Sequence, residues 1–498
     1  MPDGNSKTNI MSLTTFNPLA ASQEKIPERI LSLDVLRGIA LLGILVISIW
    51  EFGGFTTQEQ NFYRTGTHGG NYKLLTIVSM LFEGKMRALF ALVFGAGIIL
   101  FMQKKHPVPI GSADAYIRRQ MWLIVFGVFN AFILLWPGDI LFQLGVVGIL
   151  LFAFYRISAK GLFIAAMLCT LIYCGKQYWN YADDKKSYKK YMVVKDVEKK
   201  FKQDSTTRAK KDSLDRTKDT VLLKDTLLKN KLTDSLAKKN DTLTKKQAEE
   251  KGRWEGTLKG MKYDSSGAKA ENKAMRNHHY SKVWDHLMER SQNKEASWLY
   301  RIGVWDIGAM MFLGMALFSI GFFHQRMSGA KYLLLGILFI AVGLALAWYR
   351  VQCNNIRLAD YEKYVQKQAL PHNFFFPLER LFLATGYASM IIWLLRMKIF
   401  NVCWRGLAAA GRMAFTNYIL QTVICTLFFY GYGFGYFGRL QQWELYFMVA
   451  EIALAQIVFS VFWLRYYSIG PLEWLWRCLI YRKWLPNKKI PTKTDLPS

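Results

Sequence analysis

The stretch Arg29–Ser48, RILSLDVLRGIALLGILVIS, decides the fold class of this chain. It joins three ionisable side chains, Arg29, Asp34 and Arg37, to an uncharged apolar run that continues to Trp50. Charged side chains are costly inside hydrocarbon, so they lie at the membrane boundary or have a function there. Arg29 is explained as the positive flank of a first membrane helix. Asp34 and Arg37 share a helix face, and structural pairing and ligand contact are both open for them.

Similar apolar runs recur along the whole chain of 498 residues, of which 52% are apolar and 20% charged. Many of these runs are long enough to cross a hydrocarbon layer of about 30 Å, which excludes an ordinary soluble fold. We therefore predict an all-α, polytopic membrane protein with about ten transmembrane helices. They are expected near residues 36–50, 74–101, 119–136, 139–155, 160–179, 303–323, 331–349, 375–396, 407–430 and 443–464.

The formal net charge of +29 does not indicate a nucleic-acid partner, because no recognised nucleic-acid motif accompanies it. Many of the cations lie in the tails and in alternate short connections between the apolar runs, next to the lipid bilayer. By the positive-inside rule this pattern predicts that both termini are cytoplasmic. The same alternation places residues 180–302 outside the cytoplasm, which long loops tolerate despite their lysines.

Residues 180–302 have a composition of their own, with many charges and a ragged repeat of DSL and DTL triplets between residues 212 and 243. A long helix or helical hairpin standing off the membrane and a partly disordered insertion both fit this pattern. A flexible stretch is expected near Ser265–Ala268. His278, His279 and His286 are a weak metal signal without acidic or cysteine ligands, so no metal site is predicted.

The chain thus divides into five predicted segments. These are a polar cytoplasmic tail (1–28), an N-terminal membrane domain (29–179), the charged insertion (180–302), a C-terminal membrane domain (303–470), and an interfacial helix with a basic tail (471–498).

The interfacial helix is predicted from the segment 471–486, PLEWLWRCLIYRKWLP. Its tryptophans interleave with cations such as Arg477, which is typical of helices that lie in the membrane interface. Glu473 is not required for such anchoring.

Charged residues interrupt the second apolar run at Glu83–Arg87, EGKMR. Gly84 between charges indicates a broken or re-entrant helix, whose freed backbone groups must line protein or a wet cavity. Glu83 and Arg87 are spaced to pair on one helix face, and with Lys85 they form a candidate ligand site.

Two further motifs place polar side chains in apolar surroundings. In WPGDI (136–140), Asp139 is an ordinary helix cap or a functional acid. In GRMAFTNYILQ (411–421), Asn417 and Gln421 share a face beyond Arg412, which gives a polar stripe or interhelical hydrogen bonds. Asp306 and Arg380 also stand at the entries of predicted helices.

These motifs resemble the YeiB family of bacterial membrane proteins, which ends in domain of unknown function 418. The matching stretches are SLDVLRGIALLGIL (32–45), EGKMRALFALVFGAG (83–97), the arginine pair 118–119, GDIL (138–141), GRMAFTNYILQ (411–421) and WLRYYSIGPLEWLWR (463–477). The resemblance implies a location in the bacterial inner membrane. The first motif also looks like the opening of a wider group of transmembrane acyltransferases, whose members with known activity move an acyl group from cytoplasmic acyl-CoA to a sugar across the membrane.

Two positions depart from the family pattern. Relatives often carry Asn at the position of Ser48 and His at the position of Asn130. Histidine is the usual acid–base group because its pKa lies near neutrality. The catalytic candidates that remain are therefore Glu83, Asp139 and His68.

Three functions follow from these observations. The first is an acyltransferase that uses acyl-CoA as a substrate, with no permanently bound cofactor and an envelope glycan or lipid as acceptor. The second is a transporter or flippase, since broken helices and intramembrane charges fit transport. The third is an envelope scaffold, and homo-oligomers fit all three. The candidate substrate-binding residues are Asp34, Arg37, Lys85, Arg87, Arg118, Arg119, Arg412, Asn417, Gln421, Glu473 and Arg477.

Overall fold

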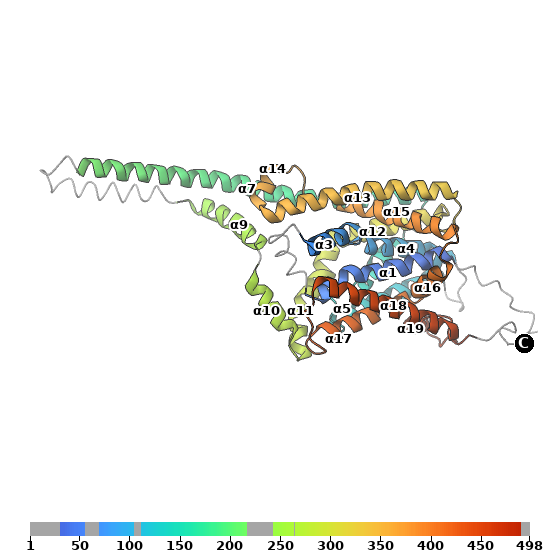
Figure 1. The fold of residues 1–498 in the computed structure, drawn as a ribbon. Coiled ribbons are helices and arrows are strands. Elements are labelled where there is room, and N and C mark those ends of the chain that lie inside the picture. Colours follow the sequence, from blue (N-terminus) through green and yellow to red (C-terminus); the bar gives the residue numbers. More distant parts are fainter. Residues whose placement is uncertain (1–29, 55–68, 104–110, 217–242, 263, 490–498) are drawn as a thin grey trace, which may run out of the picture.

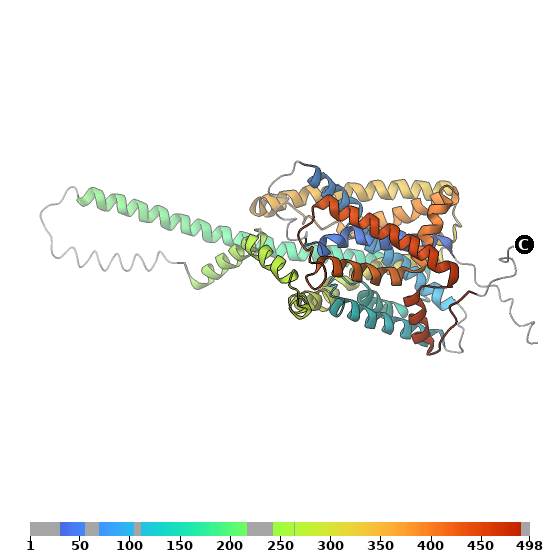
Figure 2. The ribbon, with the colours of Figure 1, turned by 60° about the horizontal axis from the view of Figure 1, so that its bottom comes forward.

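A computed structural model describes residues 30–54, 69–103, 111–216, 243–262 and 264–489. Regular structure in these residues is helical and includes no β-strand, which confirms the predicted all-α class. The long helices run side by side in one elongated bundle (Figure 1). A helical arm projects from one end, and helix α19 (Pro471–Tyr481) lies at the other (Figures 1 and 2). We call these the arm end and the tail end.

The bundle is built from helices of both predicted membrane domains. They are α1 (Leu31–Phe52), α3 (Gly70–Leu81), α4 (Lys85–Gln103), α5 (Ser112–Phe132), α6 (Leu141–Phe152), the first part of α7 (Ala159–Arg216), α12 (Val304–Ser319), the short 3-10 turn η2 (Phe322–His324), α13 (Gly329–Ala359), α15 (Phe376–Arg396), α16 (Asn401–Arg412), α17 (Ala414–Phe429) and α18 (Gln442–Tyr466).

The remaining helices lie at the two ends of the bundle. They are α9 (Lys245–Met261), α10 (Ser265–Met275), α11 (Tyr280–Gln292), the π-helix η1 (Asn293–Gly303) and α14 (Tyr361–Lys367) on the arm side, and α19 (Pro471–Tyr481) on the tail side.

Seven helical segments of the described residues are long and apolar enough to cross a membrane. One of them combines α3 with α4, and another combines α11, η1 and α12. The shorter apolar helices α6 and α17 belong to the same bundle, as does α5. Large apolar side chains such as Leu334, Phe447 and Leu454 are each more than 60% exposed on the outside of the bundle, where a soluble protein would have polar groups. The structure therefore confirms a polytopic helical membrane protein.

Small residues allow the central helices to approach closely. A Cβ atom on Gly38 of α1 would lie 2.1 Å from the Leu407 carbonyl oxygen of α16. A Cβ atom on Gly314 of α12 would lie 1.8 Å from the Leu92 carbonyl oxygen of α4. Membrane helices associate through such backbone contacts because lipid supplies no hydrophobic drive between them.

The insertion forms an ordered helical arm where it is described. Helix α7 continues without a break past residue 180, and α9 folds back along it (Figure 1). Two ion pairs connect them, Lys190–Glu250 at 2.8 Å and Lys251–Glu198 at 2.5 Å. Most of the DSL and DTL repeat lies outside the described residues.

The base of the arm is an aromatic cluster. Trp254 of α9 is fully buried there and packs against Tyr188 of α7 and Tyr361 of α14, with ring centroids 5.1 and 5.8 Å away. The aromatic contacts thus attach the arm to the connection that follows α13.

The prediction of a flexible stretch near Ser265–Ala268 is wrong, because these residues form the first turn of α10. The Asp264 side chain accepts a hydrogen bond from the Ser266 backbone N–H at 3.0 Å and caps the helix.

Helices α10 and α11 cover the arm end of the bundle. Tyr280 Oη donates to the Ile133 carbonyl at 2.7 Å, and Trp284 Nε1 donates to the Phe132 carbonyl at 3.0 Å. These carbonyls end α5 and have no partner within their own helix. The insertion therefore fixes the turn after α5, where Asp139 lies.

Candidate functional site

A break between α3 and α4 creates the first group of buried charges. Helix α3 ends at Leu81, Gly84 has a φ of +73°, and α4 begins at Lys85, as the sequence predicted. The left-handed conformation at Gly84 suits a residue without a Cβ atom. A Cβ here would also lie 2.7 Å from the Phe376 ring. The break thus turns Glu83 and Lys85 toward α13 and α15.

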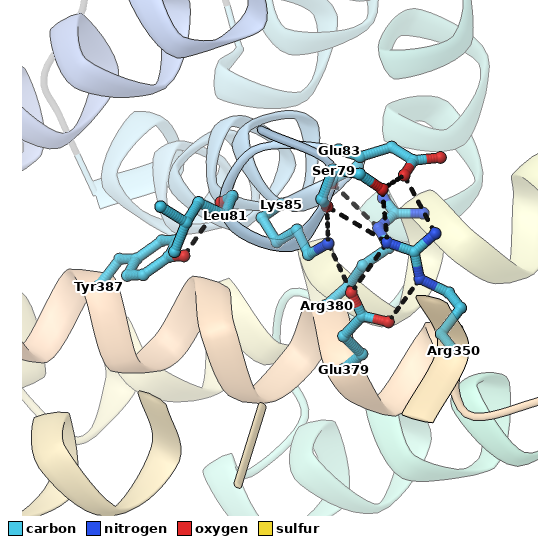
Figure 3. A network of polar contacts seen from close by, with 9 residues as sticks. Ser79, Leu81, Glu83, Lys85, Arg350, Glu379, Arg380 and Tyr387 are labelled. Atoms are coloured by element: carbon cyan, nitrogen blue, oxygen red, sulfur yellow. Dashed lines mark hydrogen bonds and ion pairs between the residues drawn. The ribbon is translucent and has the colours of Figure 1, made fainter. Parts of the chain in front are cut away.

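These charges meet partners from α13 and α15 (Figure 3). Lys85 Nζ lies 2.5 Å from a Glu379 carboxylate oxygen, and both side chains are completely buried. Arg350 bridges the two acids, with its Nε 2.9 Å from Glu379 and its Nη1 3.0 Å from Glu83. Ser79 also hydrogen-bonds Glu83. We call Ser79, Glu83, Lys85, Arg350 and Glu379 the central ion network.

A further ion pair lies beside the central ion network. Arg380 Nη1 lies 2.5 Å from the Asp306 carboxylate, and its Nε donates to the Gly84 carbonyl at 3.0 Å. The two residues that the sequence placed at helix entries are therefore partners.

The predicted pairing of Glu83 with Arg87 is wrong. Glu83 faces Arg350, whereas the Arg87 guanidinium lies over the Trp298 ring, 5.9 Å from its centroid. Glu83 lies in the turn at the Gly84 break and Arg87 lies on α4, so their spacing in sequence no longer places them on one helix face. Sequence reasoning also missed Arg350 and Glu379, because nothing local to them signals a distant partner.

A second buried group surrounds Asp139 in the turn between α5 and α6. Asn130 Nδ2 donates to Asp139 Oδ1 at 2.8 Å, and Tyr418 Oη donates to the same oxygen at 3.3 Å. Asp139 Oδ2 accepts from the Phe142 backbone N–H at 2.8 Å, which is the capping role. Asp139 is completely buried, and burial raises its pKa to about 7. The capping contact and an acid–base function can therefore coexist in this carboxyl group.

Glu295 adds an acid that the sequence analysis missed. It lies on the π-helix η1, and such helices occur frequently at functional sites. Both of its carboxylate oxygens are buried, and neither has a hydrogen-bond partner among the described residues. The charges of Asp139 and Arg87 act on it electrostatically. We call Asn130, Asp139, Tyr418 and Glu295 the arm-end acid site.

A third group gathers arginines at the tail end. The Arg119 guanidinium is stacked among the rings of Phe94 and Trp476, each 5.1 Å away. Its Nη1 is buried and has no hydrogen-bond partner among the described residues. The positive charges of Arg37 and Arg477 both act on Arg119. We call Arg37, Arg119 and Arg477 the tail-end arginine cluster.

Asp34 belongs to the edge of this cluster. Arg37 Nη1 donates to Asp34 Oδ1 at 3.2 Å, so these two residues pair as their spacing allowed. Both side chains remain partly exposed, at 30% for Arg37 and 18% for Asp34. The pair therefore leaves guanidinium donors accessible to a ligand.

The adjacent arginines of the 118–119 motif point in different directions. Arg119 enters the cluster, whereas Arg118 lines a separate outward-facing groove with Arg482. Successive residues on an α-helix differ by about 100° in direction, which accounts for the separation.

The polar stripe on α17 consists of interhelical hydrogen bonds. Asn417 Nδ2 donates to Ser460 Oγ at 2.9 Å, and Gln421 Nε2 donates to Gln456 Oε1 at 2.9 Å. Both partners lie on α18. Of the two alternatives for these residues, interhelical hydrogen bonding therefore accounts for their contacts.

Two more predicted residues fix the tail end. Glu473 accepts hydrogen bonds from the backbone N–H groups of Phe415 and Thr416, at 2.7 and 3.0 Å, and so caps α17. Arg412 Nη2 donates to the Ser468 carbonyl at 2.9 Å. Glu473 thus connects α19 to α17, and Arg412 connects the end of α16 to the segment between α18 and α19.

His68 lies outside the described residues. Within the described residues, no group of three or more His, Cys, Asp or Glu side chains could hold a metal ion.

Comparisons with known proteins agree with the resemblance in the motifs. Residues 306–483 match the model of a family described as a protein of unknown function, DUF418. The chain is 25% identical to uncharacterized protein YxaH of Bacillus subtilis over 473 residues, which cover 93% of this chain and 96% of the relative. It is 27% identical to uncharacterized protein YeiB of Escherichia coli over 475 residues, 91% of this chain and 97% of the relative. No solved structure is significantly similar. The chain is therefore similar over most of its length to YeiB and YxaH, and its residues 306–483 are similar to the DUF418 family.

Proposed function

We propose that this protein transfers an acyl group from a cytoplasmic CoA-type donor to an acceptor at the outer face of a bacterial inner membrane. The tail end is the cytoplasmic side in this proposal, which the distribution of lysine and arginine supports. The arm end, with the insertion, then faces the envelope.

The placement of Arg119 and Asn130 on one helix carries the proposal. They are 11 residues apart on α5, which is about three turns, so they share a face and are separated by roughly 16 Å along the axis. Arg119 belongs to the tail-end arginine cluster, and Asn130 holds Asp139. An acyl-CoA donor matches this separation, because a flexible chain connects its phosphates at one end to its reactive thioester at the other.

The tail-end arginine cluster suits the phosphates of such a donor. Arginine presents several N–H groups in a planar fork that matches phosphate oxygens. The Nη1 of Arg119 is buried without a hydrogen-bond partner among the described residues, and Arg37 and Arg477 add positive charge around it. Lys85, by contrast, is fully engaged by Glu379 and is not a donor-binding group in this proposal.

Asp139 is the proposed general base. A carboxylate that takes a proton near neutral pH is matched to this role. It accepts the proton of an acceptor hydroxyl as that oxygen forms a bond to the acyl carbon, the thioester C–S bond breaks, and the CoA thiolate leaves. Asn130 and Tyr418 orient the carboxylate by donating to Oδ1. Glu295, whose carboxylate oxygens have no hydrogen-bond partner in the part of the chain that the structure describes, offers acceptors for further hydroxyl groups of a sugar or lipid.

The test uses the purified full chain in nanodiscs with acetyl-CoA as the probe. We expect the wild type to bind acetyl-CoA and to hydrolyse it slowly or transfer its acetyl group to an envelope extract. Asp139→Asn should retain binding and lose about 100- to 10,000-fold in turnover. Arg119→Gln should lose binding, whereas the matched control Arg156→Gln, in the turn before α7, should not. A wild type that neither binds nor hydrolyses acetyl-CoA refutes the proposal.

Transport of a small polar or lipid-linked substrate is the second candidate, and the broken helix favours it. Discontinuous helices with buried charges are typical of transporter sites. The central ion network at the α3–α4 break has this character. Substrate-driven counterflow in liposomes that persists in Asp139→Asn and fails in Glu83→Gln would favour transport over acyl transfer.

A further inference from the structure

We propose that the groove between α5 and α19 at the tail end binds one anionic phospholipid. The groove has a volume of about 490 Å³. Its walls come from the outward face of α5, from α19, and from the turn that follows α19. The lining residues are Arg118, Met121, Trp122, Val125, Leu475, Cys478, Leu479, Arg482, Lys483 and Trp484.

The charge of the groove matches a lipid phosphate. Three of its lining residues are cations, Arg118, Arg482 and Lys483, and none is acidic. Arg482 has a φ of +50° and ends α19, so the chain turns back at this point. Trp474 Nε1 holds the returning chain by donating to the Leu485 carbonyl at 2.7 Å. Two cations from the turn thus lie in the same groove as Arg118 of α5.

The apolar side of the groove distinguishes a phospholipid from a free phosphate. Met121 and Val125 line it and are more than half exposed on the outside of the bundle. The exposed apolar surface continues along α5 at Val128 and Phe129, and at Ile133 just after it. An acyl chain of the lipid can lie along this apolar surface while the headgroup phosphate contacts the cations, because the chain is apolar and the headgroup is charged. A free phosphate has no part that would use it.

This site is independent of the proposed acyl transfer. Arg118 faces outward, whereas Arg119 enters the tail-end arginine cluster on the neighbouring face of α5. Lipid binding in the groove therefore does not require any residue that we assign to the donor or to the arm-end acid site.

The test is native mass spectrometry of the full chain with phosphatidylglycerol or phosphatidylcholine of identical acyl chains. We expect one tightly retained phosphatidylglycerol and a weaker phosphatidylcholine adduct. A cation next to anionic lipid contributes roughly fivefold to affinity, so Arg118→Gln with Arg482→Gln should weaken phosphatidylglycerol binding about 25-fold. Arg156→Gln, which removes an exposed cation stacked on Tyr155, is the matched control and should have no effect.

A second variant separates the two halves of the groove. Val125→Trp fills the apolar side without changing the charge, and it should also weaken phosphatidylglycerol binding. Equal retention of the two lipids, or undiminished phosphatidylglycerol binding in the double arginine variant, would overturn the proposal. Displacement of phosphatidylglycerol by inorganic phosphate at matched ionic strength would also overturn it. So would displacement by acetyl-CoA, if the double arginine variant loses acetyl-CoA binding together with phosphatidylglycerol binding.

Discussion

Replacing Glu379 with glutamine removes the negative charge that Lys85 and Arg350 share. Lys85 Nζ lies 2.5 Å from this carboxylate and Arg350 Nε lies 2.9 Å from it. In Glu379→Gln the two cations retain one carboxylate, that of Glu83, which faces Arg350. Lys85 is completely buried, and the Ser79 carbonyl is its remaining close acceptor at 2.8 Å.

The expected cost follows from this geometry. Breaking a buried ion pair by removing one partner typically costs about 3–5 kcal/mol, because the other charge stays buried without compensation. That corresponds to a decrease of roughly 100- to 4,000-fold in the ratio of folded to unfolded protein. We expect the free energy of unfolding, measured by denaturant titration in mixed micelles, to fall by this amount.

Glu198→Gln is the matched control, since Glu198 also pairs with a lysine at 2.5 Å. That pair lies on the arm with both side chains about 30% exposed, and exposed pairs contribute roughly 0–1 kcal/mol. The double variant Lys85→Met, Glu379→Met should be more stable than Glu379→Gln, because it leaves no lysine charge uncompensated. A Glu379→Gln protein that loses no more stability than Glu198→Gln would refute the reasoning.

Three further outcomes are expected. Gly38→Val should destabilise the bundle and lower the yield of folded protein on size exclusion, because the added Cβ would lie 2.1 Å from the Leu407 carbonyl. Trp254→Ala should release the arm to limited proteolysis at a local cost of about 3–5 kcal/mol, whereas Trp179→Ala, 73% exposed, should not. Burial raises the pKa of Asp139 to about 7, so the free energy of unfolding should fall as pH rises from about 4 to 7, while base-dependent turnover rises. Asp139→Asn should remove both trends. Unfolding curves with the same pH dependence in the wild type and in Asp139→Asn would contradict the assignment.

The sequence by itself predicted features that depend on local pattern. Apolar runs long enough to cross a bilayer gave the membrane class, and the Gly84 interruption gave the broken helix, because both follow from hydrophobicity and backbone freedom within one segment. The Asp34–Arg37 pair is local in the same way. Because the geometry of a helical turn is regular, residue spacing alone is enough to predict these features.

Only the tertiary structure decided which charges meet across helices. Glu83 finds Arg350, which is 267 residues away, instead of its neighbour Arg87. The arm end shows the same limit, because Asp139 is held by Tyr418 from a helix that follows 279 residues later.

Local spacing fixes the direction of a side chain within its own helix, but the partner it meets depends on how the helices pack. The Arg118–Arg119 pair illustrates both parts of this statement. Their adjacency alone predicts two different faces of α5, whereas the packing of α19 decided that Arg118 lines an outward-facing groove and that Arg119 stacks among aromatic rings near Arg37 and Arg477.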